Sequence, residues 1–169
     1  WLEVYETSAC DGADAEFARL GPYGKVYIGE DGMGDCVIEA ELKTAPQSAE
    51  GSAGVLFRLT EPAEGGEGAD PVLGINFFIG YCVSLTDDSV ILTKHRYDAR
   101  ELTRHRIVGR GDSHRIRVEA VADHIAVYLD GREEPVIAYR DPDPLTHGRA
   151  GIRANDCLVE KAVIRISFL

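Results

Sequence analysis

Two long stretches of alternating side chains, residues 74–85 and 89–97, constrain the fold more than any other part of the sequence. Both are rich in Val, Ile, Phe and Tyr, and only Thr86-Asp87-Asp88 separates them. Such stretches, joined by a short acidic turn, are typical of a β-hairpin. Because the side chains of a strand alternate between two faces, both faces of this hairpin carry bulky groups. One face therefore supplies a core, and the other needs a cover or a ligand.

The rest of the chain repeats this pattern in shorter pieces. Further strands are predicted at residues 1–5, 25–28, 35–43, 53–59, 101–107, 114–121, 124–130, 135–139, 148–154 and 158–168. Residues 7–20 are small, polar and acidic, and residues 61–71 are interpreted as a mobile surface loop because Glu, Gly and Pro dominate them. No window shows helical periodicity with caps. The pattern predicts one all-β domain over residues 1–169, an antiparallel sandwich or barrel.

The charge balance excludes two classes of partner. The chain of 169 residues has 29 acidic and 18 basic residues, which gives a net charge of −11. Nucleic acids and anionic membrane surfaces are bound through Lys and Arg, so neither is expected as a partner. A neutral ligand, a cation or a protein remains possible. Because the sequence starts at Trp1 without Met, we expect a domain that has been cut from a longer protein, with a processed mature product as the alternative.

The cysteines and histidines show no metal-binding spacing. The four cysteines include no Cys-x-x-Cys pair, so free buried thiols are expected, with a Cys36–Cys157 disulfide as the alternative. The five histidines include no His-x-His or His-x-x-x-His pair. His114 and His124 lie at strand starts and are interpreted as residues at a sheet edge.

Motifs for catalysis are equally scarce. The sequence has no Gly-x-Ser-x-Gly elbow and no phosphate-binding Gly-x-x-x-x-Gly-Lys loop. Glu39 and Glu41 are two residues apart and therefore share one strand face, which is the placement that a pair of catalytic carboxylates needs. We interpret them as exposed acids on a half-buried strand, with a catalytic role as the alternative.

The order of several segments resembles a known family. The relevant sequences are AGVLFRL at 53–59, NFFIGYCVSL at 76–85, SVILTKHRY at 89–97, SHRIRVEAVADHIAVYLDG at 113–131 and HGRAG at 147–151. Together they resemble the concanavalin-like jelly-roll modules, which include carbohydrate-binding module family 66 and accessory domains of bacterial glycoside hydrolases. The resemblance implies two antiparallel sheets, a sugar on the concave one, often a structural calcium ion, and a place outside the cell or at its surface. The Glu-x-Asp-x-x-Glu motif of the laminarinase-type relatives is absent, and the acidic insert 61–71 and the single Trp depart from the family pattern.

Two sets of candidate residues follow. Sugar binding requires an aromatic ring and polar groups that contact hydroxyls in pairs. The candidates for sugar binding are Phe78, His95, Tyr97, Arg104, Tyr139, Arg153, Asn155 and Asp156. The last three are close together in the sequence, beside the end of a predicted strand. Calcium takes carboxylate oxygens in flexible geometry, and the candidates in the acidic loops are Asp11, Asp31 and Asp35.

Three functions remain open from the sequence. The first is a non-catalytic module or accessory domain of a bacterial glycoside hydrolase that binds plant or microbial glycan of the fructan or arabinan type. The catalytic domain of the parent glycosidase would then be its protein partner. The second is a small hydrolase acting on a sugar derivative, and the third is a purely structural accessory domain that supports a catalytic domain through an apolar face. We expect no catalytic residues in this chain alone.

Overall fold

The computed structural model describes residues 6–10, 14–17, 19–60, 78–109 and 111–169. Within these ranges the regular structure consists of strands. They are β1 (Glu6–Cys10), β2 (Asp14–Phe17), β3 (Tyr23–Ile28), β4 (Cys36–Pro46), β5 (Ser52–Thr60), β6 (Ile79–Leu85), β7 (Ser89–Arg96), β8 (Asp98–Arg106), β9 (Ser113–Val121), β10 (His124–Leu129), β11 (Ile137–Arg140), β12 (Arg149–Asn155) and β13 (Cys157–Phe168). In this part of the chain, no helix is long and apolar enough to cross a membrane.

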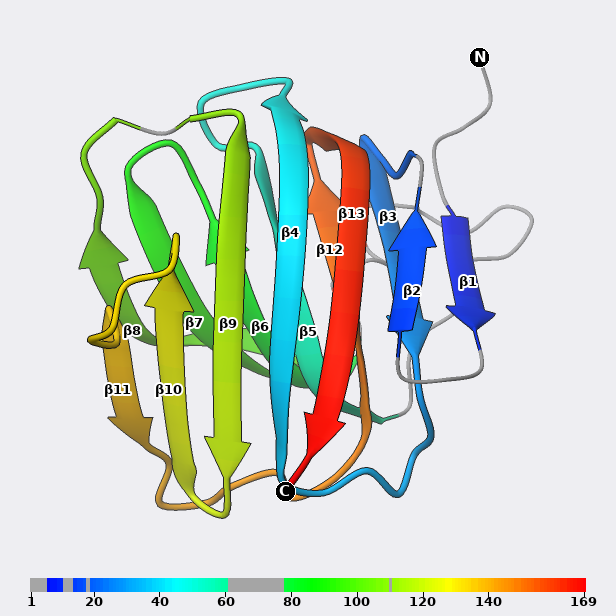
Figure 1. The fold of residues 1–169 in the computed structure, drawn as a ribbon, viewed down its shortest axis with the longest axis vertical. Coiled ribbons are helices and arrows are strands. Elements are labelled where there is room, and N and C mark those ends of the chain that lie inside the picture. Colours follow the sequence, from blue (N-terminus) through cyan, green and yellow to red (C-terminus); the bar gives the residue numbers. More distant parts are fainter. Residues whose placement is uncertain (1–5, 11–13, 18, 61–77, 110) are drawn as a thin grey trace.

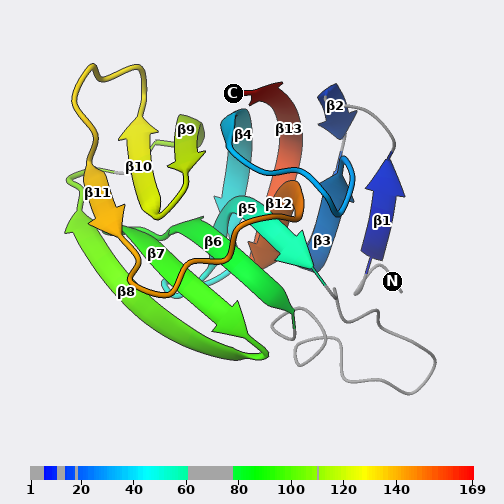
Figure 2. The ribbon, with the colours of Figure 1, turned by 90° about the horizontal axis from the view of Figure 1, so that it is seen from below.

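The strands form two stacked sheets (Figures 1 and 2). The seven-stranded sheet has the order β1-β3-β12-β5-β6-β7-β8, and the six-stranded sheet has the order β11-β10-β9-β4-β13-β2. Neighbouring strands run antiparallel, except that β1 is parallel to β3. The predicted all-β sandwich is therefore confirmed, with one parallel pair at the edge of a sheet.

The main core lies between the two sheets. In β4, Ile38, Ala40 and Leu42 are buried, whereas Glu39 and Glu41 between them are exposed. This period of two places one face of the sheet against its partner and the other in solvent. Strand β4 lies between β9 and β13, so residues early and late in the chain share this core.

The outer faces of the two sheets differ. A second apolar cluster lies outside the main core and consists of residues from the seven-stranded sheet and the start of its central hairpin. Its members are Tyr27, Leu56, Leu59, Phe78 and Cys82. The outer face of the six-stranded sheet instead carries exposed charged residues of β4, β9 and β13. The prediction that both faces of the 74–97 hairpin carry groups that need burial is thus confirmed for its described residues.

Two sequence-based interpretations need correction. Strands β1 and β2 fall almost entirely in the segment 7–20, where no strand was predicted because small and acidic residues have low strand propensity; β1 begins one residue earlier, at Glu6. His114 is buried in β9, which is flanked by β10 and β4 and is not an edge strand. The expectation of free buried thiols is confirmed for Cys36, Cys82 and Cys157, and the alternative Cys36–Cys157 disulfide is wrong because the β4–β13 ladder places these two residues at opposite ends of the strands. The predicted strand 1–5, the loop 61–71 and residues 74–77 lie outside the described residues.

Candidate functional site

Two of the predicted sugar-binding residues, Phe78 and His95, lie on the outer face of the seven-stranded sheet and stack on each other. Their ring centroids are 4.1 Å apart with an interplanar angle of 20°, and the Lys25 Nζ atom lies 5.9 Å from the Phe78 centroid. Phe78 is 0% exposed and His95 is 2% exposed. Because a sugar stacks on an accessible ring face, these rings stabilise the sheet here and present no platform for stacking.

An accessible group of polar side chains lies at one end of the same sheet. We call Tyr23, Ser48, Asn155 and Asp156 the Tyr23 cluster. Tyr23 and Asn155 are direct partners in the β3–β12 ladder and therefore share a face. The Tyr23 hydroxyl donates to Asp156 Oδ1 at 3.4 Å, and the Ser48 hydroxyl donates to Asp156 Oδ2. The four side chains are exposed or half-buried.

The backbone around Asp156 holds this cluster in place. Asp156 forms the turn between β12 and β13 with a φ of +50°, a conformation that Asp adopts more readily than most residues. Its carbonyl oxygen accepts a hydrogen bond from the N–H of Gln47 at 2.9 Å, which ties the turn to the β4–β5 connection. Burial, followed by the nearby charge of Asp156, raises the pKa of Tyr23, so its hydroxyl remains a donor at neutral pH.

The Tyr23 cluster contains the group types that bind a sugar. It combines an aromatic ring with an acceptor carboxylate, a side-chain amide that both donates and accepts, and a hydroxyl. Sequence reasoning identified Asn155 and Asp156 but missed Tyr23 and Ser48. An aromatic residue directly after a Gly-Pro turn was the available signal for Tyr23, whereas Ser48 had no distinguishing signal.

Arg153 is separated from this accessible group by burial. It lies two residues before Asn155 on the same face, opposite Lys25 and Gly54 in the ladders. Its exposure is 7% and that of Lys25 is 0%. Arg153 therefore belongs to the buried part of this face, whereas Asn155 belongs to the accessible part.

The other three predicted sugar-binding residues lie elsewhere. Arg104 is in the edge strand β8, where its guanidinium forms a two-bond fork with Glu101 at 2.8 and 3.0 Å. Tyr97 follows β7 and is 41% exposed. Tyr139 belongs to β11 in the other sheet and packs against the main core. The structure does not bring these three residues to the Tyr23 cluster.

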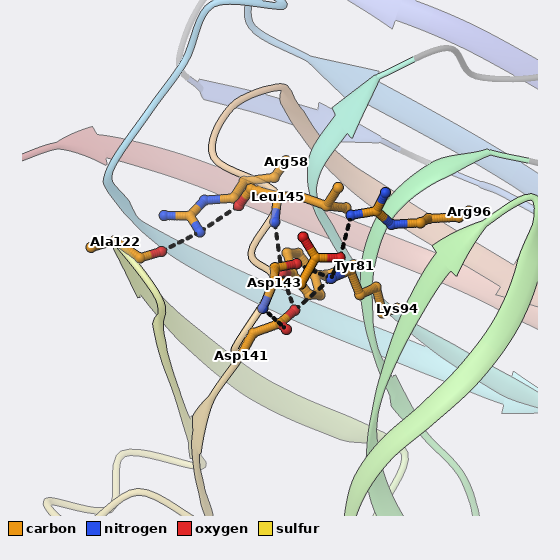
Figure 3. A network of polar contacts seen from close by, with 8 residues as sticks. All are labelled: Arg58, Tyr81, Lys94, Arg96, Ala122, Asp141, Asp143 and Leu145. Atoms are coloured by element: carbon orange, nitrogen blue, oxygen red, sulfur yellow. Dashed lines mark hydrogen bonds and ion pairs between the residues drawn. The ribbon is translucent and has the colours of Figure 1, made fainter.

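A buried polar network lies beside the β11–β12 connection (Figure 3). The Tyr81 hydroxyl donates to Asp141 Oδ2 at 2.6 Å, and Lys94 Nζ donates to the same oxygen at 2.9 Å. The backbone N–H of Asp143 donates to Asp141 Oδ1 at 3.0 Å, and that of Leu145 donates to the Tyr81 oxygen at 3.0 Å. Each of the three central side chains is less than one-tenth exposed. The network anchors the connection and is closed to a substrate.

The protonation states in this network are fixed by its hydrogen bonds. Burial opposes ionisation of Asp141, but donors from Tyr81, Lys94 and the Asp143 backbone outweigh it and lower the pKa of Asp141. Burial and the hydrogen bond to Asp141 raise the pKa of Tyr81. Asp141 is therefore a carboxylate that accepts hydrogen bonds from the neutral Tyr81 phenol and from Lys94.

The predicted calcium ligands do not assemble a site in the described residues. Asp31 Oδ1 accepts from Arg149 Nε at 2.9 Å. Asp35 Oδ1 accepts from Arg58 Nη2 at 3.0 Å and from the Ala122 N–H at 2.9 Å. Within the part of the chain that the structure describes, no three His, Cys, Asp or Glu side chains gather as a metal site would require. Asp11 lies outside this part.

Glu39 and Glu41 lie on the outer face of the six-stranded sheet, opposite arginines. Glu41 Oε1 accepts two hydrogen bonds from Arg115, at 2.7 and 3.1 Å. Glu39 is the ladder partner of Arg117 in β9 and of Arg165 in β13. This placement is typical of a solvated charge ladder.

Comparison with solved structures shows what the fold is similar to. The carbohydrate-binding module CBM66 of Bacillus subtilis matches with a TM-score of 0.56 and 17% identity over 90% of this chain and 79% of that one. The exoplasmic/lumenal domain of VIP36, solved with Ca²⁺ and Man3GlcNAc bound, matches with a TM-score of 0.60 and 10% identity over 90% and 84% of the two chains. The galectin LEC-6 of Caenorhabditis elegans matches with a TM-score of 0.51 and 12% identity over 90% and 95%.

The fold is a concanavalin-like jelly roll. At these identities the similarity establishes the fold of the chain and leaves its ligand open. No protein-family model matches the chain, and no curated protein sequence matches it. The jelly roll places the Tyr23 cluster at one end of its seven-stranded sheet.

Proposed function

We propose that this jelly roll binds carbohydrate without cleaving it, through the Tyr23 cluster. The observation that carries the proposal is the accessible arrangement of Tyr23, Ser48, Asn155 and Asp156 at the end of a face whose residues around β3, β5 and β6 are buried. Tyr23 supplies the ring, and the Asp156 carboxylate and Asn155 amide supply paired contacts for neighbouring hydroxyls. The names of the similar structures, a carbohydrate-binding module and lectins, agree with this choice of ligand.

The proposal extends to the biological setting. We place the chain as an accessory module of a glycoside hydrolase, which it would direct to a fructan- or arabinan-type glycan. A similar GH43 protein of Bacillus licheniformis, BlXynB, matches over 87% of this chain but only 33% of its own length, with a TM-score of 0.52 and 11% identity. A jelly roll of this size can therefore form one part of a larger glycosidase. The catalytic partner domain is part of the same proposal.

Titration followed by amide NMR tests this function. Fructo-, arabino-, galacto- and β-gluco-oligosaccharides are added in turn, with calcium and with chelator, and the supernatant is assayed for released sugars. We expect one glycan class to shift the amide signals of residues around Tyr23 and Asp156 without releasing product. A melting temperature that falls with chelator alone would show that calcium stabilises the fold, independently of the sugar.

Two substitutions locate the site. Tyr23→Ala removes the ring, and Asp156→Asn removes the charge while keeping a residue that tolerates a positive φ. Each is expected to weaken binding by about tenfold or more, because the first removes the ring on which the sugar stacks and the second leaves a sugar hydroxyl without its charged acceptor. The matched control is Tyr128→Ala, a tyrosine on the outer face of the six-stranded sheet. Equal affinity of all four proteins would refute the assigned site, and no binding of any glycan would refute the function.

A further inference from the structure

On the outer face of the six-stranded sheet, the rule is that oppositely charged residues lie opposite each other on neighbouring strands. Glu39 is opposite Arg117 on one side and Arg165 on the other, and Glu41 is opposite Arg115. Opposite charges across neighbouring strands stabilise a sheet by a few tenths of a kcal/mol to about 1 kcal/mol per pair, and like charges destabilise it. The face is therefore built from attractive pairs.

One rung of this face breaks the rule. Lys43 of β4 is the direct ladder partner of Lys161 of β13, and Ser113 of β9 is the partner of Lys43 on the other side. Partners in an antiparallel ladder share a face, so the two ammonium groups project to the same side of the sheet. Places where a sequence departs from a local rule of stability are expected where function requires it.

A groove lies over this rung. It has a volume of about 480 Å³ and runs across β9, β4 and β13, the strands in front in Figure 1. Its polar lining consists of Glu41, Lys43, Ser113, Arg115, Asp130 and Lys161, together with His114. Three cations thus face two carboxylates, in a chain whose net charge is −11. A groove of this volume can hold a ligand the size of a sugar.

The two carboxylates of the groove are already bonded to neighbours. Glu41 accepts from Arg115. Asp130 Oδ2 lies 3.0 Å from His114 Nδ1, and Asp130 Oδ1 accepts from the Arg115 backbone N–H at 2.9 Å. These bonds hold the carboxylates at the wall of the groove and reduce their repulsion of an incoming anion.

The lysines keep donors for a ligand. Lys43 pairs with Glu160 at 2.9 Å and Lys161 with Glu16 at 3.1 Å, and all four side chains are about half exposed. Exposed pairs of this kind contribute about 0–1 kcal/mol, so an anion can compete with them or bridge them. An ammonium group has three N–H donors, and one carboxylate contact does not use them all.

We propose that this groove binds a small hydroxylated organic anion. The carboxylate, phosphate or sulfate group of the ligand lies between Lys43 and Lys161, and its hydroxylated body extends over Ser113 and Arg115. The site lies on the sheet opposite the Tyr23 cluster and is independent of the carbohydrate function proposed above. The ligand gives a shared anionic partner to the only like-charged rung that the ladders on this face contain among the described residues, whose lysines each have one exposed carboxylate partner of their own.

Amide NMR titration at low ionic strength tests the proposal. The probes are glucuronate and glucose 6-phosphate, with glucose and inorganic phosphate as references. We expect both organic anions to shift the amide signals of Lys43, Ser113 and Lys161 and to bind several-fold more tightly than inorganic phosphate. Glucose should leave these signals unchanged. Added salt should weaken binding, since exposed charges are screened.

A charge-matched pair of variants assigns the effect to the groove. Lys43→Gln/Lys161→Gln removes both cations, and Arg100→Gln/Arg106→Gln removes the same total charge from β8 in the other sheet. The lysine variant should bind the organic anions at least about tenfold more weakly, as expected for the loss of charge-assisted hydrogen bonds. The arginine variant should stay within about twofold of the unmodified protein, because neither arginine lines the groove and both belong to the other sheet.

Three results would overturn the proposal. The first is the absence of shifts at these amides with any anion. The second is equal weakening by both variants, which would indicate a general effect of net charge. The third is binding of inorganic phosphate as tight as that of the organic anions, which would remove the role of the hydroxylated body. The amide spectrum of each variant without ligand shows whether it is folded.

Discussion

Near the β11–β12 connection, a buried ion pair determines how much individual residues contribute to the free energy of unfolding. Asp141 and Lys94 are almost fully buried, and their mutual attraction and the Tyr81 hydroxyl offset the cost of removing both charges from water. Such a pair adds little net stability compared with apolar residues in the same place. Removing one partner is nevertheless strongly destabilising, because the charge of the other stays buried and uncompensated. The neighbouring Asp143 carboxylate, which is 78% exposed, lies 2.9 Å from Arg96 in solvent. Replacing Asp141 should therefore cost much more stability than replacing Asp143, two positions later.

We expect Asp141→Asn to lower the free energy of unfolding by about 3 kcal/mol or more, because the buried Lys94 charge loses its close, buried carboxylate and keeps only the exposed Asp143 carboxylate, at 3.8 Å. The exposed Asp143→Asn, as the matched control, should change it by less than about 1 kcal/mol. Urea unfolding followed by circular dichroism measures both. Equal effects of the two substitutions would contradict the assignment of the buried pair.

The same pair predicts a pH dependence. The pKa of Asp141 is lower in the folded state than the unfolded value of about 3.9, so its contribution is fully present above that value. It is lost as the pH falls through the lowered folded pKa. The difference in stability between the unmodified protein and Asp141→Asn should therefore be constant from about pH 5 to 7 and shrink below about pH 4. A difference that grows in acid would refute this sign.

At the scale of elements, glycine allows the strands of the seven-stranded sheet to approach closely. A Cβ atom added at Gly54 of β5 would lie 1.8 Å from the Val83 carbonyl oxygen of β6. One added at Gly151 of β12 would lie 2.1 Å from the Val26 carbonyl oxygen of β3. Backbone atoms cannot yield as a flexible side chain can, so any side chain at these positions separates the ladders.

Gly54→Ala is expected to lower the unfolding free energy by about 1–3 kcal/mol, the usual range for overpacking. Gly32→Ala is the control, because an added Cβ there meets nothing within 4 Å. Thermal unfolding of the two variants should show a clear drop in melting temperature for the first alone. A melting temperature of Gly54→Ala equal to that of the control would contradict the close approach.

At the scale of the whole molecule, the sandwich is closed by residues far apart in the chain. Strand β4 (Cys36–Pro46) pairs with β13 (Cys157–Phe168), and β3 pairs with β12, so both sheets join early residues to late ones. Contacts of high sequence separation require large loops to close before they contribute stability.

We therefore expect slow folding, in about milliseconds to seconds, as for other all-β domains of this topology. Stopped-flow circular dichroism after dilution from urea measures the rate. Deleting residues 157–169 should abolish cooperative unfolding, because β4 and β2 lose their common neighbour. A truncated chain that unfolds cooperatively would contradict this account.

The sequence by itself determined the strands and the faces of most of them. Alternation in 35–43 and 114–121 is a local property with a period of two, and burial of one face follows from it. It also predicted Asn155 and Asp156 near a sheet end. It did not predict β1 and β2, whose small and acidic residues carry no such signal. The reason is that these short strands are stabilised by pairing with β3 and β13 and not by their own composition.

The tertiary structure alone decided which polar residues meet and which rings are accessible. Tyr23 and Ser48 contact Asp156 although more than a hundred positions of sequence separate them from it. Lys43 and Lys161 are similarly distant in the sequence and are direct partners in the β4–β13 ladder. Phe78 and His95 were candidates for contact with a sugar, and they are buried against each other. Residue type and spacing determine which way a side chain points from its strand. Accessibility and partners depend on how distant strands pack, and no local pattern contains that information.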